Sequence, residues 1–136
     1  MNVIALEGKS NVGKTSTINI VYQLLLQSGY AQVSGYFEDL ANNDFLDVMT
    51  NNNHTIGIVS QGDYAIGKSS VKNHLSKLQS YGCDKVICAC TIDRSPKIKA
   101  AVLVYPNVVV EKLPQPIVEL QRIDNNRHAN SILSYI

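Results

Sequence analysis

The sequence predicts an α/β fold, a three-layer sandwich in which a mostly parallel sheet lies between helices. Three observations support this prediction. Short continuous apolar runs, typical of strands covered on both faces, alternate along the chain with segments of helical periodicity. A hydrophobic content of 45% with a net charge of only +1 is sufficient for a packed core and argues against disorder. No Ser-, Pro- or Gly-rich linker interrupts the 136 residues, so we expect a single domain over residues 1–136.

The first two elements follow directly from this patterning. The apolar run 3–6, which ends near Gly8, predicts a buried strand. From Lys14 to Gln27 the apolar side chains recur at helical spacing, and Gly29 is a suitable residue for the C-terminal cap. The order predicted here is therefore strand, glycine-containing loop, helix.

The next segment predicts strands. Residues 31–37 are expected to form the second strand, and the acidic, asparagine-rich stretch 38–44 is expected to form a loop. Asparagines 51–53 separate two strand-like runs, and asparagine tolerates the positive φ angles of tight turns. The sequence therefore predicts a β-hairpin over about residues 45–59.

In the second half of the chain, predicted helices and strands alternate again. A helix after Asp63 is indicated by apolar residues at positions 71, 75 and 78, and it is expected to end near Gly82. Four further elements follow in order: a strand over 85–90, a short helix over 96–104, a strand over 108–110 and a terminal helix over 124–136.

The segment Gly8–Thr15, GKSNVGKT, matches the pattern G-x-x-x-x-G-K-[ST] and lies between the first predicted strand and helix. Glycines let such a backbone wrap a phosphate, and successive N–H groups at a helix N-terminus supply partial positive charge. Lys14 adds a full charge, and Thr15 offers a hydroxyl to Mg²⁺. The predicted phosphate-binding residues are Gly8, Lys9, Ser10, Asn11, Val12, Gly13, Lys14, Thr15 and the adjoining Ser16.

On this motif the chain resembles the P-loop NTPase superfamily over residues 1–28. The string SNVGKT is similar to the phosphate loop of ribosome-assembly GTPases, but the D-x-x-G switch and the N-K-x-D guanine reader of that family are absent. In size and element order the chain looks more like small, poorly characterised bacterial ATP-binding proteins or minimal nucleotide kinases. The resemblance implies a P-loop NTPase-like sandwich that binds Mg-ATP, with GTP the less favoured nucleotide.

An acidic residue is expected beside the metal. Asp63 and Asp93 each follow an apolar strand-like run, and P-loop enzymes place an aspartate at such a strand end. Asp63 is favoured, as a ligand for Mg²⁺ and as a residue that orients the nucleophile, because small and polar residues precede it. Asp93 is the alternative, and a helix N-cap is the structural explanation for either residue.

Other charged residues are also candidates for contacts with a phosphate or a substrate. Arg94, with Lys97 and Lys99, follows the strand at 85–90, where a cation would neutralise charge on a transferred phosphoryl group. Solvent exposure is the alternative for these cations. Glu38 and Asp39 at the end of the second predicted strand are candidates for a general base or substrate contact, or are simply loop acids.

A second segment, residues 62–69, also matches G-x-x-x-x-G-K-[ST]. Its first glycine is followed by an aspartate and a tyrosine, which would bring negative charge and bulk towards a phosphate. We therefore assign phosphate binding to Gly8–Thr15 and expect Lys68 and Lys72 on a solvated helix face. Whether the second match is a coincidence or a trace of duplication stays open.

The leading functional interpretation is Mg-dependent ATP binding followed by hydrolysis or by phosphoryl transfer to a small acceptor, with Lys14, Asp63 and Arg94 as catalytic candidates. The alternative is a regulatory module that binds nucleotide with little turnover, in which a homodimer supplies missing groups.

Composition limits the remaining function classes. No apolar run is long enough to span a membrane and no secretory signal begins the chain, so a cytoplasmic protein without membrane attachment is expected. Near-neutral charge and few aromatic residues disfavour nucleic-acid binding. The three cysteines, within residues 83–90, lack metal-ligand spacing and are expected in the core.

Overall fold

The computed structural model describes residues 1–52 and 54–136 and contains seven strands and four helices. In chain order they are β1 (Asn2–Gly8), α1 (Lys14–Gln27), β2 (Ala31–Gln32), β3 (Glu38–Asp39), β4 (Phe45–Asn51), β5 (His54–Val59), α2 (Val71–Ser80), β6 (Lys85–Thr91), α3 (Pro96–Leu103), β7 (Asn107–Glu111) and α4 (Val118–Leu133). A short 3₁₀ turn, Ala41–Asn43, precedes β4. None of these helices is long and apolar enough to cross a membrane.

All seven strands join one mixed sheet. Its main path runs β2-β4-β5-β6-β1-β7, and β3 pairs with β4 off this path. The four strands β5, β6, β1 and β7 are parallel, whereas β4 pairs antiparallel with β2, β3 and β5. Strands β1, β5 and β6 are mostly buried apolar runs, as expected for strands covered on both faces, whereas the edge strand β7 buries only Val110.

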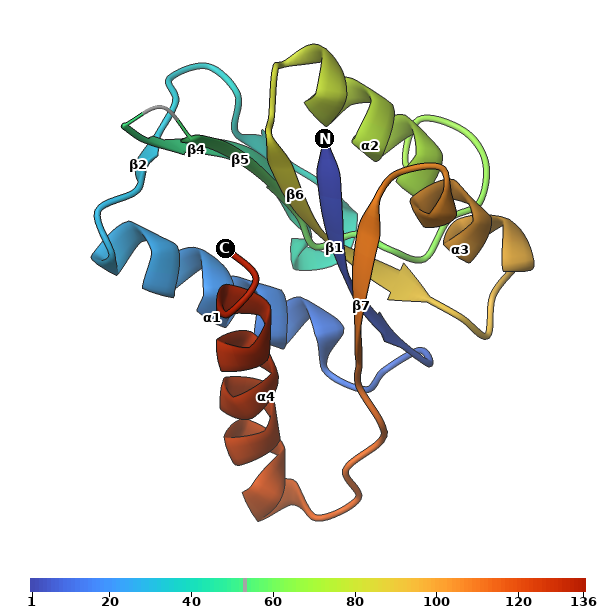
Figure 1. Ribbon diagram of the computed structural model, residues 1–136. Coiled ribbons are helices and arrows are strands. Elements are labelled where there is room, and N and C mark those ends of the chain that lie inside the picture. The colour runs from blue at the N-terminus through green and yellow to red at the C-terminus, as the bar shows by residue number, and fades with distance from the viewer. Residues whose placement is uncertain (53) are drawn as a thin grey trace.

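Helices cover both faces of the sheet, which makes three layers (Figure 1). Helices α1 and α4 pack on one face, where Ile18, Val21 and Ile132 are buried against the strands. Helices α2 and α3 pack on the other face through Leu75, Ile98 and other side chains. The predicted three-layer α/β class is therefore confirmed.

Several element predictions agree with the structure. Helix α1 spans the predicted residues, and β4 and β5 form the antiparallel pair expected over about 45–59, although Asn53 of the predicted turn lies outside the described residues. Helix α3 begins and ends within a residue of its prediction. The three cysteines are free and buried, and burial raises the pKa of Cys83 and Cys90 to about 11.

Three predictions were wrong in detail. The strand expected over 31–37 is only β2, because Gly35 adopts φ 91° and turns the chain. The loop expected over 38–44 contains β3, whose residues pair with β4. Helix α4 begins at Val118, six residues before the prediction, because its first turns expose apolar side chains that gave no inward-facing pattern.

Candidate functional site

The candidate site lies where the carboxyl ends of three parallel strands meet. Strand β1 ends at Gly8, β5 leads into Ser60, and β6 ends at Thr91. The connection from β1 leads along the sheet in the direction opposite to the connections from β5 and β6, so the topology reverses at β1 (Figure 1). Crevices at such a reversal are where open α/β sheets bind ligands.

At two positions of the loop between β1 and α1, only glycine can be accommodated. Gly13 adopts φ 93° and precedes the first residue of α1, Lys14. A Cβ atom at Gly8 would lie 2.7 Å from the Lys112 carbonyl oxygen and 2.9 Å from the Val12 side chain. The two glycines of the motif are therefore required by close packing and by a left-handed turn.

Lys14 closes the loop from the helix side. Its Nζ atom donates to the Gly8 carbonyl at 3.2 Å and to the Lys9 carbonyl at 2.5 Å. The side chain is buried, and desolvation by burial lowers the pKa of Lys14, while the nearby carboxylates of Asp63 and Asp93 act in the opposite direction. The ammonium group thus lies inside the curve of the loop.

The first turn of α1 offers its amide groups to the same space. Its earliest backbone hydrogen bond runs from the Thr17 N–H to the Gly13 carbonyl at 3.0 Å. The amides that precede Thr17 in the helix are those that an α-helix leaves without an internal partner. Together with the helix dipole they favour an anion at this end of α1.

Asp44 is fixed beside Thr15 by two hydroxyl groups. Its Oδ1 atom accepts from Thr15 Oγ1 at 3.0 Å and from Ser60 Oγ at 2.8 Å. Ser60 Oγ in turn accepts from the Phe45 N–H at 2.9 Å, which ties the end of β5 to the start of β4. A nearly buried carboxylate is therefore held against the hydroxyl expected to meet the metal.

A cavity of about 330 Å³ lies between this loop and the ends of β5 and β6. Asp63 lies on its wall, and its Oδ1 atom accepts from Thr91 Oγ1 at 2.5 Å. The N-cap explanation for Asp63 is wrong, since α2 begins eight residues later and is capped by Ser70. The lining residues are Asn11, Gly13, Lys14, Thr15, Ser16, Ser60, Gly62, Asp63, Ala89 and Thr91.

Asp93 and Arg94 lie on the exposed rim of the loop. Asp93 Oδ1 accepts from the Ser10 N–H at 3.0 Å and from Ser10 Oγ at 2.8 Å. These hydrogen bonds lower the pKa of Asp93. Arg94 Nε donates to the same hydroxyl at 3.1 Å. The rim residues therefore hold the loop's outer turn rather than line the cavity.

A second cavity, of about 250 Å³, adjoins the other side of the loop and shares Asn11, Gly13 and Ser16 with the first. Lys112, which follows β7, is 3% exposed and lines this cavity. Its Nζ atom lies 3.2 Å from Nδ1 of His128, and burial lowers the pKa of Lys112. The other residues that line this second cavity are Val12, Pro114, Gln115, Pro116, Gln121, Asp124 and Asn125.

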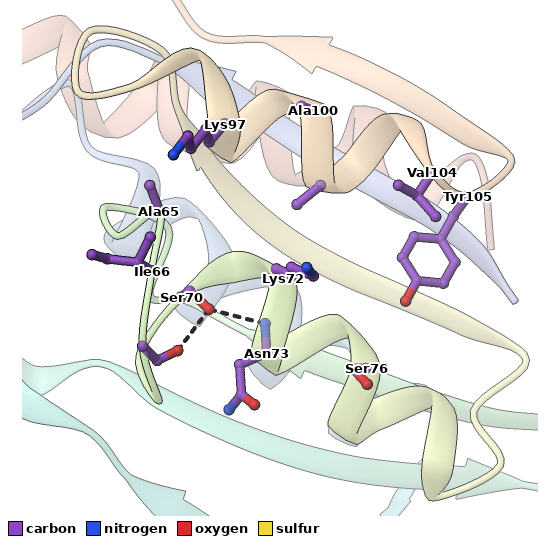
Figure 2. Close-up of a pocket in the computed structure, with 12 residues that line it drawn as sticks. Ala65, Ile66, Ser70, Lys72, Asn73, Ser76, Lys97, Ala100, Val104 and Tyr105 are labelled. Carbon is purple, nitrogen blue, oxygen red and sulfur yellow. Dashed lines mark hydrogen bonds between the residues drawn. The ribbon is translucent and has the colours of Figure 1, made fainter.

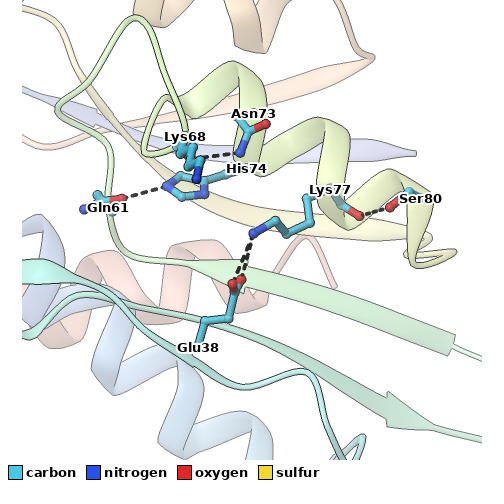
Figure 3. Close-up of polar contacts among 7 residues, drawn as sticks. All are labelled: Glu38, Gln61, Lys68, Asn73, His74, Lys77 and Ser80. Atoms are coloured by element: carbon cyan, nitrogen blue, oxygen red, sulfur yellow. Dashed lines mark hydrogen bonds and ion pairs between the residues drawn. The ribbon is translucent and has the colours of Figure 1, made fainter.

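The remaining charged candidates lie outside both cavities. Glu38 forms an ion pair with Lys77 at 3.1 Å (Figure 3), and Lys99 pairs with Glu7 at 2.9 Å. Lys68 is exposed in the loop before α2 rather than on the predicted helix face, whereas Lys72 is exposed on α2 as expected. Of the second motif match, Gly62 and Asp63 line the first cavity, and residues 65–67 line a separate groove between α2 and α3.

Figure 3 also shows a buried polar pair behind the site. His74 Nε2 lies 2.8 Å from Gln61 Oε1, and both side chains are buried. Burial lowers the pKa of His74, and the nearby Lys77 adds to the effect. Gln61 therefore faces α2, while its neighbours Ser60 and Gly62 line the cavity.

The structure brings together most of the predicted phosphate-binding residues and adds two that the sequence analysis missed. Lys112 follows the carboxyl end of β7, and that position is the signal that would have found it. Asp44 precedes β4 and reaches the same edge only because β4 runs antiparallel to β5. Among the described residues no cluster of three or more His, Cys, Asp or Glu side chains is arranged to hold a metal ion. Comparison with protein-family models, with curated proteins and with solved structures found no match to this chain.

Proposed function

We propose that this chain is a P-loop protein that binds ATP with Mg²⁺ at the loop Gly8–Thr15. The observation that carries the proposal is the cavity at the ends of β1, β5 and β6, because one wall combines Gly13, the buried Lys14 and the start of α1. A buried ammonium and the N-terminus of a helix converging on one space favour a polyanion such as a triphosphate.

The residues present fit a magnesium ion whose ligands come mainly from the phosphates. Thr15 provides a hydroxyl, and Asp44 and Asp63 provide carboxylates near it, the first by direct hydrogen bond. Mg²⁺ at phosphate sites keeps several waters and takes only one or two protein ligands, so a dedicated cluster of acids is not required. Bound there, the ion would neutralise phosphate charge.

The second cavity is suited to the nucleoside. It continues from the phosphate loop through Asn11 and Gly13, and its polar side chains carry both hydrogen-bond donors and acceptors, as a base and ribose require. Lys112 makes no ion pair with any described residue, so its buried charge is available to an acceptor atom of the ligand.

For chemistry, Lys14 would stabilise charge on the phosphates and Asp63 would orient the attacking group, which is water in hydrolysis or a small acceptor in transfer. Arg94 would need to leave Ser10 to reach a phosphate. That position on the rim favours a second candidate function, a nucleotide-dependent regulatory module with little turnover until a partner or a second copy completes the site.

The deciding experiment is calorimetric titration with ATP and GTP, with and without Mg²⁺. We expect wild type to bind Mg-ATP, and Lys14→Ala to lose at least about 100-fold in affinity, because a charge-assisted contact to phosphate disappears. Lys68→Ala is the matched control, since Lys68 occupies the equivalent place in the second motif match and is exposed.

Two results would reject the proposal: a folded wild-type protein that binds neither nucleotide, or equal losses in Lys14→Ala and Lys68→Ala. Phosphate release then separates the two functional candidates. Turnover that scales with protein and vanishes in Lys14→Ala supports the enzyme, whereas tight binding without release supports the regulatory module.

A further inference from the structure

A groove of about 810 Å³ lies between α2 and α3, on the opposite face of the sheet from α1 and α4 (Figure 2). Its walls come from the loop at Ala65–Gly67, from α2 and from α3. The lining extends from Lys97 near the start of α3 to Tyr105 just beyond its end, and the helical part from Lys97 to Leu103 alone spans about 9 Å. The groove is therefore long enough for several residues of an extended or helical segment.

Its floor is apolar, and its edges are positively charged. Ala100 and Ala101 are small and leave room between the helices, while Ile66 and Val104 are each 78% exposed. Lys72 on α2 and Lys97 on α3 also line the groove, and neither forms an ion pair with a described residue.

The layer formed by α2, α3 and their adjoining loops carries side-chain charges of one sign only. Residues 64–83 and 94–110 contain six basic side chains and no aspartate or glutamate. Two of the six are neutralised by acids from other parts of the chain, Lys77 by Glu38 and Lys99 by Glu7. The layer thus presents lysines around an apolar groove with no acid of its own to pair with them.

We propose that this groove binds a segment of a partner protein that carries apolar anchor residues flanked by aspartate or glutamate. Apolar side chains would fill the space above the alanines, and the partner's carboxylates would pair with Lys72 and Lys97. Nucleic acid fits less well, because backbone recognition relies on many phosphate contacts whereas this floor is apolar. The proposal does not depend on nucleotide binding.

The test begins with random 16-residue peptides displayed on phage, selected on wild-type protein and counter-selected on Lys72→Glu/Lys97→Glu. Both lysines are exposed, so the variant is expected to fold, and circular dichroism verifies this. The enriched peptides are then titrated by fluorescence anisotropy and mapped by amide chemical shifts. Arg122→Glu/Arg127→Glu, with the same change of charge on exposed positions of α4, is the matched control.

We expect the enriched peptides to combine apolar and acidic residues and to shift amides within 65–76 and 97–105. The groove variant should lose about tenfold or more in affinity, and the α4 control should stay within about twofold. The proposal is overturned by absence of enrichment, by peptides without acidic residues, or by shifts elsewhere. Tighter binding of a single-stranded oligonucleotide or of inorganic phosphate at these residues, or a homodimer that the groove variant dissociates, also overturns it.

Discussion

The buried histidine behind the site makes folding stability depend on pH. Burial lowers the pKa of His74 below its ordinary 6.5, so the unfolded state binds the proton more tightly. The free energy of unfolding is therefore not reduced by this histidine well above pH 6.5, and it falls as the pH decreases through about 6.5. We expect the melting temperature of wild type to drop between pH 7 and pH 5, and His74→Gln, whose amide can still donate to Gln61, to drop less.

His54→Gln is the control, because His54 is exposed at the start of β5. It should retain the wild-type slope of melting temperature against pH. An identical slope in His74→Gln would show that the buried ring is not responsible. Part of the slope will persist in that variant, since burial also lowers the pKa of His128.

Lys112 is expected to lower the folding stability of the chain and to contribute to nucleotide binding. Burial lowers its pKa, so the charged form is disfavoured in the folded chain and stability rises with pH towards 10.5. Lys112→Met would keep the apolar stem without the charge. At pH 7 without nucleotide we expect its melting temperature to be a few degrees higher and its affinity for Mg-ATP lower.

Differential scanning fluorimetry and calorimetric titration measure these two effects, with Lys68→Met as the exposed control. A Lys112→Met variant that is less stable and binds ATP normally would contradict both parts of the argument.

Asp44 makes a similar test possible at the metal. Asp44→Asn should reduce the dependence of ATP binding on Mg²⁺ while binding without metal persists.

At the scale of the elements, α2 depends on its capping residue. Ser70 Oγ accepts from the Asn73 N–H at 3.1 Å, while the Ser70 hydroxyl donates to the Gly67 carbonyl at 2.7 Å. Ser70→Ala removes both hydrogen bonds and should destabilise the protein by about 1 kcal/mol in urea unfolding. Ser80→Ala, at the exposed end of the same helix, should change stability by less than about 0.5 kcal/mol.

Elements with a strong local signal were predictable from the sequence, and those fixed by distant contacts were not. Helix α1 has apolar residues at regular spacing and a capping glycine, and its predicted limits are confirmed. The two-residue strands β2 and β3 exist because β4 offers them a partner, and nothing local indicates a pairing across such a separation. The predicted start of α4 was wrong for a related reason, since its exposed Val118 and Ile123 face no described core.

The same distinction applies to the candidate site. The loop Gly8–Thr15 is contiguous, so its motif could be recognised in the sequence. Asp44 and Lys112 reach it only because β4 begins, and β7 ends, at the edge of the sheet where β1 ends. Their contribution depends on strand order, which local patterning does not determine.

At the scale of the whole molecule, one sheet carries both helical layers and the ends of β1, β5 and β6 form the proposed site. Each layer has its own buried apolar cluster, but the two clusters share the strands between them, so unfolding should be a single cooperative transition. A ligand that bridges three strand ends binds only the folded state and should shift that transition as a unit. With Mg-ATP at 100 times the wild-type dissociation constant we expect about 2.7 kcal/mol of added stability in wild type and at most about 0.4 kcal/mol in Lys14→Ala, whose affinity is expected to be at least about 100-fold lower. Calorimetric scans measure this shift. Two transitions, with ATP moving only one of them, would show instead that the layers unfold separately.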